Sequence, residues 1–157
     1  MEIKLDRYRF YGAKIGKVRS FSPISSAESY LISVDDNTTI STGVRFITHD
    51  NSVIKCFENG TDLVGAISIG KNCFIGANTI ILPGVTLVDN IIVAAGSCVT
   101  KSFYEENIII AGNPAKKIGN IDTFKEKYKE YVFNFKGLSS YEKRILIEKN
   151  PQKLLKK

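Results

Sequence analysis

The single histidine of the chain, His49, is the residue best suited to acid–base chemistry, and it stands between Thr48 and Asp50. An imidazole has an unperturbed pKa of about 6.5, so it can accept and return a proton near neutral pH. A lone histidine is nevertheless more often structural or merely exposed than catalytic. The residue type is therefore compatible with a general base at position 49 and with a structural role, and the surrounding sequence is needed to distinguish the two.

Three cysteines, Cys56, Cys73 and Cys98, have no CxxC spacing. Their odd number and the absence of an apolar signal core at the N-terminus argue against a disulfide framework. A catalytic zinc site ordinarily has three protein ligands, and one histidine without paired cysteines does not supply them. The sequence thus predicts no metal site, and thiols that are buried or incidental.

The positive charge of the chain is concentrated at its C-terminal end. The net charge is +6, and residues 116–157 carry 12 Lys and Arg against 5 Asp and Glu, whereas residues 1–115 carry 10 against 11. A nucleic-acid surface spread over the whole protein is therefore not expected. No apolar run approaches the roughly 20 residues of a membrane-spanning helix, and there is no signal core, so we expect no membrane insertion and a cytoplasmic protein.

An aliphatic residue recurs at every sixth position, in the series Ile69, Ile75, Ile81, Leu87, Val93 and Val99. A period of six is too long for a helix, whose apolar stripe repeats near 3.6 residues, and for simple strand alternation. It is typical of a short strand followed by a corner, with the aliphatic side chain pointing inward and glycine or asparagine at the corner, as at Gly76, Asn72 and Asn78. Three such sides close a coil of about eighteen residues, and stacked coils pair as parallel strands.

The same spacing occurs upstream at Val34, Ile40 and Phe46, and then breaks before Ile69. Insertions in solenoids leave the coils as loops, often on the functional face, so we expect residues 50–62 to form an extruded loop. Within that loop Asn51, Ser52 and Asp62 are candidate hydrogen-bond partners for a substrate.

We therefore predict two domains. Residues 1–115 form an all-β solenoid, and residues 116–157 form a basic extension of α-helices, because the apolar residues after Pro114 follow helical spacing. In this extension Ser139 and Glu142 have the spacing of a capping box, which predicts the start of a helix.

Three segments resemble the hexapeptide-repeat acyltransferases, which include maltose, galactoside and xenobiotic acetyltransferases and the O-acetyltransferases of bacterial surface polysaccharides. The segments are Ser68–Thr86, Ala95–Lys101 followed by Ala111-Gly-Asn-Pro-Ala-Lys116, and Gly43-Val-Arg-Phe-Ile-Thr-His-Asp50. The resemblance covers roughly residues 12–120 and implies a left-handed parallel β-helix, a homotrimer, and acyl-CoA bound in a cleft between neighbouring subunits. The left hand is unusual, because parallel crossovers are ordinarily right-handed.

The resemblance further implies an enzyme that transfers an acetyl group from acetyl-CoA to a hydroxyl of a sugar or a surface polysaccharide. His49 corresponds to the base that removes the proton of the acceptor, and Asp50 is expected to orient His49 or to bind the acceptor. Because a thioester is already activated, transfer is expected directly within a ternary complex, without a serine or cysteine nucleophile. The positions that match the family's CoA-binding residues are Ala77, Ala95, Thr100, Lys101 and Lys116.

Two other interpretations stay open. N-acetylation of an amino sugar or a sugar nucleotide would use the same base on the same fold, so the sequence hardly separates it from O-acetylation, although Gly43–Asp50 is more similar to the O-acetyltransferases. A non-catalytic scaffold would use the solenoid as a binding surface. Such a scaffold would need neither His49 nor the lysines at the predicted cofactor positions.

Overall fold

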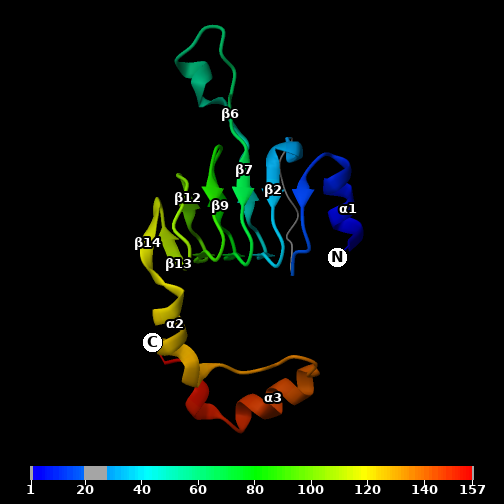
Figure 1. Ribbon diagram of the computed structural model, residues 1–157, viewed down its shortest axis with the longest axis vertical. Helices are drawn as coiled ribbons and strands as arrows, with labels where there is room; N and C mark the ends of the chain where they lie inside the picture. Colours follow the sequence, from blue (N-terminus) through cyan, green and yellow to red (C-terminus); the bar gives the residue numbers. More distant parts are fainter. Residues whose placement is uncertain (1, 20–27, 157) are drawn as a thin grey trace. The chain divides into compact units, whose positions relative to one another are not determined.

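The structure, a computed structural model, describes residues 2–19 and 28–156. The chain divides into two compact units, Met1–Asn120 and Ile121–Lys157. Short strands make up most of the first unit, and helices make up the second (Figure 1). The boundary predicted between residues 115 and 116 lies at the start of strand β14 (Ala115–Asn120), which belongs to the first unit.

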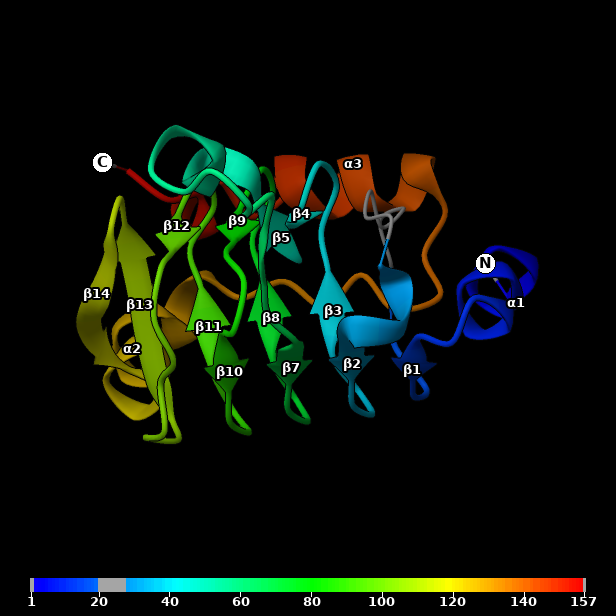
Figure 2. The same ribbon diagram turned by 90° about the horizontal axis from the view of Figure 1, so that it is seen from above.

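Apart from a two-stranded hairpin, the described strands of the first unit form three sheets, and the chain runs through these sheets in rotation from Ile32 to Val99. The strand orders are β1-β2-β7-β10 in sheet A, β14-β13-β11-β8-β3 in sheet B and β12-β9-β4 in sheet C. Figure 2 shows β3, β8, β11 and β13 side by side, in the order of the chain. The bounds are β1 Lys14–Ile15, β2 Ile32–Val34, β3 Thr39–Ile40, β4 Arg45–Phe46, β7 Ile67–Ile69, β8 Phe74–Ile75, β9 Ile80–Ile81, β10 Thr86–Leu87, β11 Ile92–Val93, β12 Cys98–Val99 and β13 Ile108–Gly112.

The register of the parallel pairs confirms the predicted repeat. In the central turns, paired residues are eighteen positions apart in all three sheets, as in Phe74 with Ile92 and Ile80 with Cys98. Each of the six aliphatic anchors from Ile69 to Val99 is 0–1% exposed, so their side chains form a continuous core between the sheets. Burying one such side chain contributes roughly 1.5–3 kcal/mol, so the stack of anchors makes a large contribution to stability.

The corners use asparagine and glycine for two different reasons. Asn72 and Asn78 have positive φ values of 56° and 58°, which confirms them as turn residues, because asparagine tolerates the left-handed region. Gly76 has no positive φ. A Cβ at this position would lie 2.4 Å from the backbone N of Ala95 in the next coil, so Gly76 is required by the close approach of two backbones.

A hairpin interrupts the stack where the sequence predicts an extruded loop. Strands β5 (His49–Asp50) and β6 (Leu63–Val64) pair antiparallel, and the 3-10 helix η2 (Asn51–Lys55) follows β5. Figure 1 shows this loop extending away from the coils beyond β6. Because of the insertion, Thr39 pairs with Phe74, thirty-five positions later, whereas Phe74 in turn pairs with Ile92, eighteen positions later.

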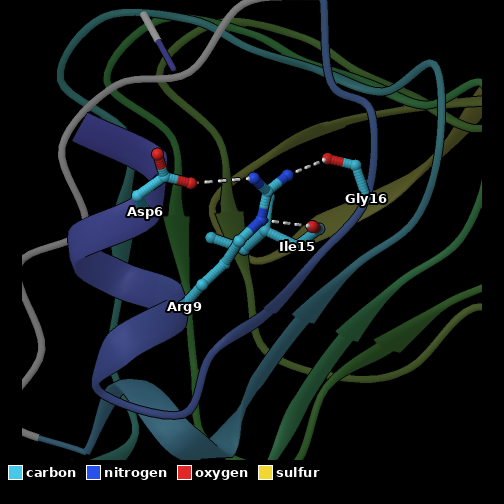
Figure 3. A network of polar contacts seen from close by, with 4 residues as sticks. All are labelled: Asp6, Arg9, Ile15 and Gly16. Atoms are coloured by element: carbon cyan, nitrogen blue, oxygen red, sulfur yellow. Dashed lines mark hydrogen bonds and ion pairs between the residues drawn. The ribbon is translucent and has the colours of Figure 1, made fainter. Parts of the chain in front are cut away.

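The first coil is capped by Arg9, from helix α1 (Glu2–Phe10). Neighbouring coils exchange main-chain hydrogen bonds in both directions, as from Gly16 N–H to Val34 O and from Asn37 N–H to Lys17 O, whereas Ile15 O and Gly16 O in the first coil have a side chain as their donor. Arg9 is this donor, since its Nε lies 3.0 Å from Ile15 O and its Nη2 3.1 Å from Gly16 O, while Asp6 accepts from Nη1 at 3.2 Å (Figure 3).

Replacement of Arg9 by alanine is expected to lower the free energy of unfolding by about 1–2 kcal/mol, because two carbonyls lose a charged donor. Arg7→Ala, on the same helix but exposed, is the matched control and is expected to change it by less than about 0.5 kcal/mol. Urea denaturation followed by circular dichroism measures both. Equal stability of the two variants would show that the cap does not stabilise the first coil.

The second unit contains helices α2 (Ile121–Tyr128) and α3 (Ser140–Glu148), with 3-10 turns η3 (Lys129–Tyr131) and η4 (Pro151–Lys153). Ser139 caps α3, accepting from the backbone N–H of Glu142, whose carboxylate accepts in return from the backbone N–H of Ser139, so the predicted capping box is confirmed. None of the helices described here or in the first unit is both long and apolar enough to cross a bilayer.

Candidate functional site

His49 stands at the point where the coils give way to the hairpin. The preceding residue, Thr48, is 1% exposed and accepts a hydrogen bond from the backbone of Gly65 through its carbonyl oxygen, at 2.9 Å. The side chain of His49 is 43% exposed. A buried anchor on one side and the β5–β6 pairing on the other therefore fix the backbone of His49 while its imidazole is open to a substrate.

A carboxylate that sequence reasoning missed binds this imidazole. Glu28 Oε2 lies 2.8 Å from His49 Nδ1, and the same oxygen accepts a hydrogen bond from Thr48 Oγ1 at 2.6 Å. Glu28 precedes the 3-10 turn η1 (Ser29–Leu31) and comes from a segment with no hexad pattern. No spacing in the sequence links it to His49, so only the fold brings the two together.

Three carboxylates set the electrostatics around the imidazole. The hydrogen bond and the charge of Glu28 raise the pKa of His49 above its usual value, and the charges of Asp62 and Asp50 add to this shift. Hydrogen bonds from Thr48 and His49 hold the pKa of Glu28 below its usual value. Glu28 is therefore an anion at neutral pH, and the site favours the protonated form of His49 more than water does.

Asp50 bonds to the backbone of its own loop, and the hydrogen bond to the imidazole comes from Glu28. Its Oδ1 accepts from the backbone N–H of Ser52 at 2.9 Å, which caps η2 and lowers the pKa of Asp50. The three predicted acceptor-binding residues, Asn51, Ser52 and Asp62, are exposed on the same loop. The loop thus presents polar groups near His49, and Asp50 holds the start of that loop in shape.

A groove of about 280 Å³ lies beside the hairpin and brings together Asp50 and Thr100. Its walls are Leu63, Val64 and Gly65 from the hairpin side and the corner Leu82–Gly84 from the next coil. The corners are in direct contact, because a Cβ on Gly65 would lie 2.4 Å from the backbone N of Gly84. Thr100 is therefore on the His49 side of the coils.

Ala77 and Ala95 lie together at a different corner, between sheets B and C. The backbone N–H of Gly96 donates to Ala77 O at 2.8 Å, so the two alanines are neighbours in successive coils. This corner follows β8 and β11, whereas His49 and Thr100 follow the strands of sheet C. The predicted cofactor residues of one chain are thus divided between two corners.

The two predicted phosphate-binding lysines are exposed. Lys101 follows Thr100, and its Nζ lies 5.7 Å from the ring centroid of Phe103. Lys116 lies on β14 opposite Ala111. The adjacent Lys117 is paired with Glu105 at 2.5 Å.

The thiols and the acidic residues do not form a metal centre within residues 2–19 and 28–156, where no group of three His, Cys, Asp or Glu side chains has the arrangement to hold a metal ion. Cys73 is 2% exposed, and burial raises the pKa of its thiol to about 11. Cys56 is exposed on the loop, and Cys98 is half-buried in β12.

Residues 66–101 match the family model described as the hexapeptide repeat of succinyl-transferase. The chain is 40% identical over 148 residues to Protein CapG of Staphylococcus aureus, covering 90% of this chain and 86% of that protein. It is 32% identical over 130 residues to the galactoside O-acetyltransferase of Escherichia coli K12, covering 80% of this chain and 62% of that enzyme.

Solved structures agree with the sequence matches. A galactoside acetyltransferase in complex with coenzyme A superposes with a TM-score of 0.61 at 29% identity, covering 80% of this chain and 60% of that one. Similarity to these acetyltransferases and to CapG thus extends along most of the chain. It accompanies the repeat, its corners and the position of His49 at the inserted hairpin. The chain belongs to the hexapeptide-repeat acyltransferase family.

Proposed function

We propose that this protein transfers the acetyl group of acetyl-CoA to a hydroxyl of a sugar or surface polysaccharide, with His49 as the general base. The observation that carries the proposal is the half-exposed imidazole, hydrogen-bonded to a carboxylate and placed beside a polar loop. The relative at 32% identity is a galactoside O-acetyltransferase, and a related structure holds coenzyme A, which supports the donor and the acceptor class.

The reaction needs one proton carrier. His49 takes the proton of the acceptor hydroxyl as the oxygen attacks the thioester carbonyl carbon, and the C–S bond then breaks as the tetrahedral intermediate collapses. The imidazolium returns the proton to the leaving CoA thiolate, so the base is regenerated. Asp50, Asn51, Ser52 and Asp62 are proposed to bind hydroxyls of the acceptor from the loop. No acyl-enzyme is required, because donor and acceptor meet in one ternary complex.

The division of the predicted cofactor residues favours a site shared between copies. Thr100 and Lys101 follow sheet C on the His49 side, whereas Ala77 and Ala95 lie at the corner between sheets B and C. We propose a homotrimer in which the His49 corner of one subunit faces the Ala77 corner of its neighbour, with the pantetheine arm between them. Left-handed coiling, a trimer and a location in the cytoplasm remain predictions from the family resemblance and the N-terminal sequence.

The test is release of free CoA thiol from acetyl-CoA in the presence of neutral sugars, amino sugars, sugar nucleotides and surface oligosaccharides. Release that depends on a hydroxyl acceptor supports the proposal, and mass spectrometry of the product identifies the ester. Turnover with amine acceptors alone would assign N-acetylation. Absence of turnover together with no binding of acetyl-CoA in calorimetry would leave the scaffold function.

Removal of the proposed phosphate contacts is expected to weaken the binding of acetyl-CoA. Lys101→Ala and Lys116→Ala should each raise the Kd about five- to tenfold, because a charged contact to phosphate contributes roughly 1 kcal/mol. Titration calorimetry at low and high salt measures this, and the difference between wild type and variant should shrink at high salt. Lys125→Ala, from an exposed pair with Asp122 in α2, is the control and should leave the Kd unchanged. Unchanged affinity in both lysine variants would remove them from the cofactor site.

A further inference from the structure

The Glu28 carboxylate is held from two sides. Its Oε2 accepts from the hydroxyl of Thr48, which is 1% exposed, and lies within hydrogen-bond distance of His49 Nδ1. The buried hydroxyl fixes the oxygen relative to the core, and the oxygen in turn fixes the imidazole. Since Thr48 and His49 are adjacent on the backbone, the three side chains form one short network that leaves the imidazole little freedom to rotate.

Stability alone does not account for this arrangement. The side chain of Glu28 is 24% exposed and that of His49 43% exposed, and ion pairs that are this open to solvent contribute little to the stability of a fold. Orientation of a base has a larger consequence for rate, because a misplacement of about 1 Å can cost roughly a hundredfold.

From this contact we infer that Glu28 is a positioning residue, which binds the Nδ1–H of His49 and so leaves Nε2 as the basic atom that faces the acceptor. The inference rests on the proposed function. A neutral imidazole has one N–H, so a carboxylate acceptor at Nδ1 selects the tautomer in which Nε2 carries the lone pair. When Nε2 takes the proton of the acceptor hydroxyl, the anion at Nδ1 stabilises the imidazolium.

The other charged groups around the imidazole do not replace Glu28. Asp50 and Asp62 act on His49 through charge only, and the oxygen of Asp50 is bonded to the backbone of Ser52. Glu28 therefore supplies both the hydrogen bond and the largest part of the upward shift in the pKa of His49.

Because His49 is the only histidine, labelling the protein with ¹⁵N-histidine gives the ring nitrogens of this residue alone. In the wild type, at pH values above the pKa of His49, we expect the neutral tautomer that carries its proton on Nδ1. In Glu28→Ala the Nδ1 acceptor is gone, so we expect a mixture of tautomers and a lower pKa. In Glu28→Gln, which loses the charge at nearly constant volume, we expect a lower pKa as well. Glu106→Gln, whose carboxylate accepts from Asn90, is the matched control and should change neither.

The kinetic arm measures acetyl transfer as a function of pH. Both Glu28 variants should lower kcat about 10- to 100-fold, leave the KM for acetyl-CoA within about twofold, and shift the pH midpoint downward with the pKa of His49. An unchanged tautomer, pKa and pH midpoint in Glu28→Ala would overturn the inference. Failure of the wild type to transfer acetyl groups would instead overturn the proposed function, and the ring nitrogen signals would still test the contact.

Discussion

Replacement of His49 by alanine is expected to lower kcat for acetyl transfer about 10²- to 10⁴-fold, because the acceptor hydroxyl loses the group that takes its proton. The Kd for acetyl-CoA should stay within about twofold, since a general base contributes to the transition state more than to binding of the donor. Release of CoA thiol measures the rate, and calorimetry measures the affinity.

The pH dependence of kcat/KM in the wild type is a second test of His49. The base works unprotonated, so kcat/KM should rise with pH and level off above the pKa of His49. Glu28, Asp62 and Asp50 raise that pKa, so the midpoint should lie above the ordinary value of about 6.5. His49→Asn, a polar variant, controls for the loss of volume at this half-exposed position and should be as inactive as the alanine variant. Full activity in either would exclude His49 as the base.

Replacement of Gly76 by alanine is expected to destabilise the fold by roughly 3 kcal/mol and to lower the Tm by about 6–12 °C. The added Cβ would lie 2.4 Å from Ala95 N and 2.8 Å from the carbonyl carbon of Ala94. Both are main-chain atoms of the next coil, so no side-chain rotation relieves the clash and the coils have to separate. Thermal unfolding at a fixed protein concentration measures the change.

Gly119→Ala is the matched control for this experiment. Gly119 lies on β14 without a positive φ, and a Cβ there would meet nothing within 4 Å. Its Tm should therefore stay close to that of the wild type. Because Ala77 and Ala95 belong to the same corner, Gly76→Ala should also raise the KM for acetyl-CoA if this corner binds the cofactor. Equal Tm values for the two variants would mean that the coils accommodate the added Cβ without loss of stability.

Much of the fold was predictable because the repeat is local. One aliphatic anchor per six residues has to be buried, and Asn72 and Asn78 mark the corners by their tolerance of positive φ. Gly76 was predicted as a corner residue, but the reason for it lies in the neighbouring coil. A sequence pattern reports the conformation of one segment, and it does not report the distance to the backbone eighteen positions away.

The site was less predictable for the same reason. His49 is identified by its type and its motif, and Asp50 was the natural partner because it is adjacent in the sequence. The structure instead joins the imidazole to Glu28, which precedes η1 and lies outside the hexad series. Contacts between irregular segments follow from how coils stack, so their partners emerge only once the register of the coils is known.

The Arg9 cap also limits how copies of the chain can assemble. A stack of parallel strands has a direction, and a second molecule could extend it by donating its N–H groups to the carbonyls of Ile15 and Gly16. Arg9 already occupies both oxygens, and at the far end of sheet B the antiparallel strand β14 ends the parallel order. Growth into an end-to-end filament is thereby disfavoured, which agrees with the proposed homotrimer, in which copies would associate through their flanks.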